Sequence, residues 1–166
     1  SRCVRNEVEV IEELRQTALF HSVRTIADFK KHDDSDARDA QFRQQLETVR
    51  DSDILIGVHG AGMAHIHYLE PKSAVVELFD NFYYDQRIVE GRQSIIYQAM
   101  ARMQGCGYVS VDIRGTNSSS RGYFIPRGFT KHLASIALAA WNQTQTHAVD
   151  ECCHYQPKLL VHCPKS

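Results

Sequence analysis

Residues 53–80, DILIGVHGAGMAHIHYLEPKSAVVELFD, constrain the fold more than any other part of this sequence. They open with a short apolar run, 54–58, which is rich in β-branched residues and lies between polar residues and the glycine turn 59–62. Such a run is typical of a strand buried on both faces of a parallel sheet. We expect about two helical turns over 61–69 and a second buried strand over 74–79. This order of strand, turn, helix and strand is the unit of α/β folds.

The turn His59-Gly60-Ala61-Gly62 is the candidate ligand site of this unit. Glycines permit a sharp turn and a close approach of the backbone to a ligand. The unpaired N–H groups at the start of a helix favour an anion, phosphate above all. The turn could therefore cradle a diphosphate, with His59 donating a hydrogen bond. Because the sequence is neither a Walker loop nor GxGxxG, a tight turn without a ligand remains the alternative.

Glu77 places a carboxylate inside the apolar strand 74–79. An unpaired buried carboxylate is costly, so Glu77 needs a partner or a position at the mouth of the strand. One interpretation is that it accepts hydrogen bonds from ribose or sugar hydroxyls, as acids at strand ends do in dinucleotide folds. The other is a structural ion pair with a nearby Arg or Lys. Arg2 and Arg5 could contact phosphate bidentately, or lie solvated on the surface.

Two groups of residues suggest metal binding, and neither has the right spacing for it. His65 and His67 are two residues apart, so on a helix they do not share a face, and structural roles are favoured. The C-terminal tail lacks paired C-x-x-C spacing, so disulfides or free thiols are favoured over zinc. The soft ligands of the tail are Cys152, Cys153, His154, His162 and Cys163.

Helix and strand patterns alternate along the rest of the chain. Asn6 is a candidate N-cap for a helix over 7–17. Strands are expected within 20–29 and over 108–113, and an exposed loop over 115–128. The inward residues of the three later helices are predicted to be Phe42, Leu46 and Val49; Ile95, Ile96, Ala99, Met100 and Met103; and Leu133, Ile136, Ala137, Ala140 and Trp141.

This alternation predicts an α/β fold with a mainly parallel, doubly wound, Rossmann-like sheet. Residues 1–145 are expected to form one domain, and residues 146–166 a polar, Cys-rich tail to which the pattern assigns no element. In such a sheet, ligands bind beyond the carboxyl ends of the strands, and the turn 59–62 lies at one of these ends.

Composition excludes some partners and suggests a compartment. The chain of 166 residues has a net charge of −1, which gives no electrostatic reason to expect nucleic acid as a partner. No apolar run is long enough to span a bilayer, and the first residues do not have the order of a signal peptide. Five cysteines and the glycosylation sequons at Asn117 and Asn142 favour a secretory, oxidising lumen. Because the chain begins without methionine, we expect a mature product or a piece of a longer protein.

Four segments in matching order and spacing resemble glycosyltransferase family 61, which includes O-linked N-acetylglucosamine transferases and plant β-1,2-xylosyltransferases. They are Arg5-Asn6-Glu7, the run from Asp53 to His65, Leu69-x-Pro71, and the strand Val75 to Phe79. The resemblance implies the C-terminal, donor-binding half of a GT-B glycosyltransferase, without its first strand and its N-terminal domain. It also implies an inverting, metal-independent enzyme that needs no cofactor and uses a UDP-sugar as substrate.

The resemblance assigns roles residue by residue. Arg2 or Arg5 would face the diphosphate, the turn 59–62 would be the phosphate-side turn together with His65, and Glu77 would lie near the nucleotide ribose. The donor sugar is expected to be N-acetylglucosamine or xylose, the acceptor a glycan or glycoprotein hydroxyl, and the compartment the Golgi or the ER. The sequence names no catalytic base, and one option is that the base belongs to the missing N-terminal domain.

Two rival functions remain open at this point. One is a nucleotide-sugar-binding module without catalysis. The other is an α/β hydrolase-like enzyme that uses His59-Gly60 as an oxyanion hole, although no Gly-x-Ser-x-Gly elbow accompanies that pair.

Overall fold

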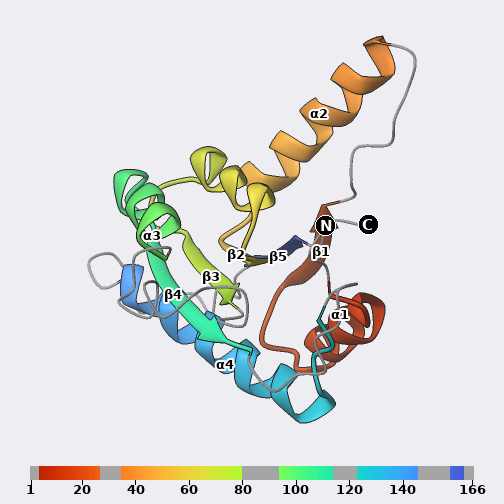
Figure 1. Cartoon of the computed structure of the whole chain (residues 1–166), viewed down its shortest axis with the longest axis vertical. Coiled ribbons are helices and arrows are strands. Elements are labelled where there is room, and N and C mark those ends of the chain that lie inside the picture. The colour runs from red at the N-terminus through yellow and green to blue at the C-terminus, as the bar shows by residue number, and fades with distance from the viewer. Residues whose placement is uncertain (1–3, 27–34, 80–93, 114–122, 146–157, 163–166) are drawn as a thin grey trace, which may run out of the picture.

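The computed structural model describes residues 4–26, 35–79, 94–113, 123–145 and 158–162. They form a five-stranded sheet in which every pairing is parallel and the strand order is β1-β5-β2-β3-β4 (Figure 1). The predicted α/β class and parallel sheet are therefore confirmed. In chain order the elements are α1 (Glu7–Gln16), β1 (Ser22–Ile26), α2 (Ser35–Arg50), β2 (Ile54–Val58), the 3₁₀-helix η1 (Ala61–Tyr68), β3 (Ala74–Phe79), α3 (Ser94–Met103), β4 (Gly107–Asp112), α4 (Arg127–Thr144) and β5 (Lys158–His162).

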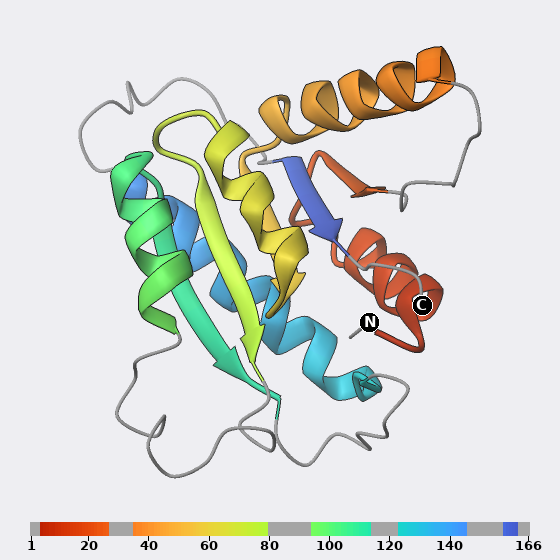
Figure 2. The ribbon, with the colours of Figure 1, turned by 45° about the horizontal axis from the view of Figure 1, so that its top comes forward.

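Helices cover both faces of the sheet, as a doubly wound fold requires. Because successive side chains of a strand point to opposite faces, β2 and β3 contribute to two separate cores. Ile54 and Val76 belong to the core under α1 and α4. Leu55 and Val75 belong to the core under α2, η1 and α3. Figure 2 shows α4 behind β3 and β4, with η1 and α3 on the near side.

The two layers of helices follow from the direction of each connection. The steps from β1 to β2, β3 and β4 all progress the same way across the sheet, and α2, η1 and α3 pack on one face. The step from β4 to β5 goes back across the sheet, and α4 packs on the opposite face. Connections between parallel strands are right-handed, so reversing the direction of a step also changes the face that its helix covers.

Residues 158–162 form β5 in the interior of the sheet, between β1 and β2, where the sequence pattern assigned no element. The first residue of β5, Lys158, fixes its register. Its backbone N–H donates to a carboxylate oxygen of Asp53 over 2.8 Å, and the Asp53 N–H donates to the Lys158 carbonyl over 2.9 Å. The Lys158 ammonium also pairs with Asp51 at 2.6 Å. These contacts hold the start of β5 beside the start of β2.

Asn6 occupies the N-cap position of α1, but its side chain does not cap the helix. Its Nδ2 donates to the Ile125 carbonyl over 2.8 Å, and the Ile125 N–H donates to its Oδ1 over 2.9 Å. The N-cap prediction was therefore wrong about the partner of this side chain. Asn6 instead ties the start of α1 to the segment before α4.

The same segment corrects the predicted exposed loop over 115–128. Residues 114–122 lie outside the described residues, whereas Tyr123 and Ile125 are buried in the core under α1 and α4. α4 begins at Arg127, which is earlier than the pattern indicated. Tyr123 and Ile125 thus form a short buried segment in a region whose glycines and polar residues favoured an exposed loop.

The predicted inward faces of two helices were partly wrong. In α2 the Phe42 side chain is 39% exposed and Gln45 is buried, although Val49 is buried as expected. α2 extends away from the sheet (Figure 1), so only its C-terminal part has a core to face. In α3 Met103 is 83% exposed and Ile96 is also exposed. In the part of the chain that the structure describes, no helix combines the length and apolar character needed to cross a membrane.

Candidate functional site

The turn after β2 lies at the carboxyl end of the sheet, and its geometry requires glycine. Gly60 has φ 156° and ψ −177°, a backbone conformation that is essentially restricted to glycine. The Gly60 carbonyl accepts a hydrogen bond from the Met63 N–H over 2.9 Å, which begins η1, and another from the Tyr97 hydroxyl over 2.6 Å. Tyr97 belongs to α3, so the helix after β3 holds the turn after β2.

His59, Glu77 and Tyr108 form a hydrogen-bonded cluster beside this turn. His59 Nδ1 bonds to one carboxylate oxygen of Glu77, and the Tyr108 hydroxyl donates to the other. The Glu77 side chain is fully buried, whereas that of His59 is 13% exposed. Three neighbouring strands contribute, since His59 follows β2, Glu77 belongs to β3 and Tyr108 to β4. The cluster therefore connects the buried carboxylate of Glu77 to the partly exposed ring of His59 at the carboxyl end of the sheet.

The chemistry of the cluster determines which nitrogen of His59 would meet a ligand. An ionised carboxylate only accepts hydrogen bonds, so His59 Nδ1 carries the proton that it donates to Glu77. A ligand at the mouth of β2 would then be met by Nε2. To donate a hydrogen bond to an anion there, Nε2 has to carry a proton as well. The contacts of Glu77 thus satisfy the demand for a partner, with a histidine and a tyrosine in place of the Arg or Lys considered from the sequence.

Burial changes the interpretation of Glu77. Both of its oxygens accept hydrogen bonds from protein side chains, and no part of its side chain is exposed to solvent. These contacts indicate that Glu77 serves to orient the His59 ring. The ribose contact stays a prediction.

His65 is tied to the same turn from within η1. Its Nδ1 donates to the Gly62 carbonyl over 2.8 Å, and because a carbonyl only accepts, this bond fixes the proton on Nδ1. The structure thus brings His59, Gly60, Gly62, His65 and Glu77 into one region. The exposed Ala61 lies between the two glycines.

The remaining candidates come from other segments of the chain. Arg5 is exposed at the start of α1, and its backbone N–H donates to the Tyr123 carbonyl over 2.7 Å. Arg2 and Asn117 lie outside the described residues. Asn142 is exposed in the last turn of α4, so its role as a glycosylation site stays a prediction.

Tyr97 and Tyr108 are site residues that the sequence pattern missed. Both are partly buried, and a tyrosine packed on a core needs a partner for its hydroxyl. Tyr108 is the second residue of β4, the strand next to the one that carries Glu77, and its position at the start of an expected strand was the signal that could have identified it. The edge of the Tyr97 ring also contacts the His59 ring, with centroids 5.3 Å apart at 74°.

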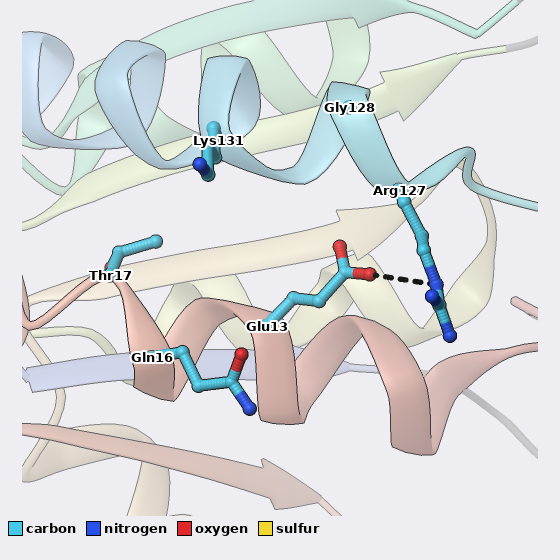
Figure 3. Close-up of a pocket in the computed structure, with 6 residues that line it drawn as sticks. All are labelled: Glu13, Gln16, Thr17, Arg127, Gly128 and Lys131. Carbon is cyan, nitrogen blue, oxygen red and sulfur yellow. Dashed lines mark ion pairs between the residues drawn. The ribbon is translucent and has the colours of Figure 1, made fainter.

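A separate cavity of about 490 Å³ lies between α1 and α4, on the other side of the sheet from η1 (Figure 3). Glu13 reaches across it to Arg127, with 3.6 Å between the charged groups. The other lining residues are Gln16, Thr17, Gly128 and Lys131. None of the residues that line this cavity was predicted as a site residue.

Neither metal nor thiol chemistry is assembled among the described residues. In those parts of the chain, no three His, Cys, Asp or Glu side chains are grouped so that they could hold a metal ion. Metal independence stays a prediction, and the tail cysteines lie outside the described residues. Burial raises the pKa of the Cys106 thiol to about 11, so this cysteine is not a thiolate nucleophile at neutral pH.

Comparison with known proteins identifies what this chain is similar to. The family model described as Glycosyltransferase 61 matches residues 1–76. The EGF domain-specific O-linked N-acetylglucosamine transferase of Gallus gallus is 31% identical over 98 residues, which are 58% of this chain and 16% of that protein. The Rattus norvegicus protein of the same description is 32% identical over 98 residues, which cover 17% of its length. The chain therefore spans about one sixth of the curated relatives that it matches. No solved structure matches it.

Proposed function

Since the family model described as Glycosyltransferase 61 matches residues 1–76 of this chain, we propose that its parallel sheet is the donor-binding part of a glycosyltransferase that uses a UDP-sugar. The observation that carries the proposal is the His59–Glu77 pair at the carboxyl end of β2, beside a turn that requires glycine. Ligands of open α/β sheets bind at this edge. A histidine held by a buried carboxylate and a glycine turn at the start of a helix suit a diphosphate, because both can donate hydrogen bonds to it.

The proposed reaction is transfer of the sugar to a glycan or glycoprotein hydroxyl, with inversion by direct displacement. Its largest demand is stabilisation of the departing UDP diphosphate, which preorganised donors provide. We assign this task to His59 Nε2 and the backbone of residues 60–62, and we propose Arg5 as a further cation for the diphosphate. We expect that this arrangement needs no bound metal.

The acceptor hydroxyl also needs a general base. We assign His59 to the diphosphate, and Glu77 is fully buried and cannot reach an acceptor. We therefore propose that the base comes from a second, N-terminal domain in a GT-B arrangement, facing the mouth of β2. The sugar is proposed to be N-acetylglucosamine, because the relatives are N-acetylglucosamine transferases, with xylose as the alternative. The compartment is proposed to be the lumen of the secretory pathway.

Calorimetry with UDP tests the donor site. We expect the full-length protein to bind UDP with or without Mn²⁺, and His59→Ala to weaken binding about 10- to 100-fold, the value of one lost hydrogen bond to a charged group. His67→Ala is the matched control, because His67 is an exposed histidine of η1, the helix that follows the turn. It should leave the affinity unchanged. A full-length protein that binds no UDP, or a His59→Ala variant that binds it as tightly as the wild type, contradicts the proposal.

A panel of UDP-sugars then separates the alternatives. Hydrolysis or transfer of one sugar by the full-length protein supports a glycosyltransferase. Binding of UDP without turnover of any sugar in the panel would favour a nucleotide-sugar-binding module.

A further inference from the structure

We propose that Tyr108 is a positioning residue of the donor site, whose hydroxyl holds Glu77 so that Glu77 fixes the ring of His59. The inference rests on the proposed function, because the orientation of the His59 ring matters for binding only if an anionic ligand contacts that ring. It adds a residue from β4, a strand that carried no predicted site residue. The proposed order of contacts runs from Tyr108 to Glu77, then to His59 and the diphosphate.

Strand register places Tyr108 where it can reach Glu77. In the β3–β4 pair, Val75 is opposite Tyr108 and Glu77 is opposite Ser110. Tyr108 is therefore the diagonal neighbour of Glu77, and residues two apart in a strand share a face. Diagonal neighbours lie within reach of aromatic side chains. Tyr108 packs against the core under η1 and α3, so its ring is held while its hydroxyl donates to the carboxylate.

The buried position of Glu77 makes this contact important. A carboxylate without solvent contact depends on protein donors, and leaving one of its oxygens unpaired costs most of the desolvation free energy of that atom. Among the described residues, His59 and Tyr108 are the donors to Glu77. If the hydroxyl is removed, the carboxylate can rotate or accept a proton. In either case, the proton on His59 Nδ1 is no longer fixed by its acceptor.

Tyr97 provides an internal comparison. Its hydroxyl donates to the Gly60 carbonyl over 2.6 Å. Tyr97 therefore supports the backbone of the turn, whereas Tyr108 supports the Glu77 carboxylate. The two tyrosines therefore support different parts of one site. Loss of the Tyr97 hydroxyl should loosen the turn without changing which nitrogen of His59 carries the proton.

The test is Tyr108→Phe, which removes one oxygen atom and keeps the ring. Nitrogen-15 NMR of the histidine ring, recorded without ligand, distinguishes a proton on Nδ1 from one on Nε2. We expect the wild type and Tyr97→Phe to show His59 with Nδ1 protonated, and Tyr108→Phe to show a mixture of the two tautomers. Calorimetry with UDP should show about tenfold weaker binding for Tyr108→Phe. Tyr68→Phe is the matched control, since Tyr68 is exposed on η1 and should leave both readouts unchanged.

The two readouts separate this inference from the proposed function. A Tyr108→Phe protein whose His59 spectrum equals that of the wild type overturns the positioning role, whatever the affinity for UDP. Equal affinity despite a changed spectrum overturns it as well. A wild-type protein that binds no UDP refutes the proposed donor site, and the ring spectrum then decides only whether Tyr108 orients His59.

Discussion

Strand β2 has two neighbours that join it in different ways. On one side lies β3, the next strand of the chain, paired from Ile54 with Ala74 to Val58 with Leu78. On the other side lies β5, whose first residue Lys158 is 105 residues from its hydrogen-bond partner Asp53. The β3 side carries the candidate site, since Glu77 contacts His59 and the His59 N–H donates to the Leu78 carbonyl over 2.9 Å.

The β5 side has contacts of another kind. The apolar side chains Leu159 and Val161 enter the core under α1 and α4, and charged contacts at Lys158 fix the start of the strand. Under the proposed function, the β3 side of β2 binds the ligand and the β5 side anchors the strand. Variants on the β5 side should therefore change stability, and variants on the β3 side should change ligand binding as well.

The largest expected effect is on the β5 side, in Leu159→Ala. Leu159 is 1% exposed, so its truncation should lower the free energy of unfolding by about 2–5 kcal/mol. Denaturant unfolding measures this loss. Leu55→Ala in β2 should cost a similar amount, and Met103→Ala on the exposed face of α3 less than about 0.5 kcal/mol. If Leu159→Ala behaves like Met103→Ala, then β5 is not an interior strand and the comparison fails.

Gly60→Ala tests whether the turn on the β3 side of β2 needs a backbone conformation that only glycine adopts. A Cβ at this position would approach no atom more closely than the Val58 carbonyl oxygen at 4.0 Å, so the cost comes from the backbone conformation. We expect a loss of about 1–3 kcal/mol in unfolding free energy, together with weaker UDP binding. Gly128→Ala in α4 is the control, because its Cβ would also meet no atom within 4 Å and its helical backbone accepts alanine. Equal stability of the two variants would show that the turn does not require glycine.

The smallest expected effect is electrostatic and lies at the start of β5. The hydrogen bond from Lys158, supported by Arg24, holds the pKa of Asp51 below its ordinary value of 3.8. A carboxylate whose pKa is lowered in the folded state stabilises the fold above the unfolded pKa, and this stability is lost as the pH falls through the folded pKa. Asp51→Asn should therefore be less stable than the wild type at pH 7, by at most about 1 kcal/mol because the pair is exposed.

Thermal unfolding at several pH values checks this effect. The difference between Asp51→Asn and the wild type should shrink below about pH 4 and should also shrink in high salt. Asp39→Asn, on the exposed surface of α2, is the control and should show no such difference. A difference that stays constant down to acid pH would mean that the Asp51 charge does not anchor β5.

The β3 side was predictable from the sequence because its signals are local. The apolar run of β2, the glycine turn and the strand of Glu77 lie close together in the chain, and each has the periodicity or composition of its element. The demand of Glu77 for a partner also followed from the sequence. Which side chains meet that demand did not follow, because Tyr108 reaches Glu77 only through the register of a third strand.

The β5 side was not predictable, because the contacts that identify it join residues far apart in the sequence. The segment Lys158–His162 has five residues, follows a polar stretch, and is recognised as a strand only by its partners β1 and β2. Long-range contacts also explain the errors in the helices. Asn6 bonds to Ile125, 119 residues away, and α2 extends beyond the sheet, so the local pattern named neither the true partner nor the true buried face.

Under the proposed function, the β3 side of β2 receives the diphosphate of a nucleotide sugar. The most direct measurement is a titration of the isotope-labelled full-length protein with UDP, followed by NMR of the backbone amides and histidine rings. We predict that the largest shifts occur at residues 59–65 and at the His59 ring, with smaller shifts in β5 and in the cavity between α1 and α4. Shifts concentrated at Arg127 and Lys131 in that cavity, or no shifts at all, would contradict the claim.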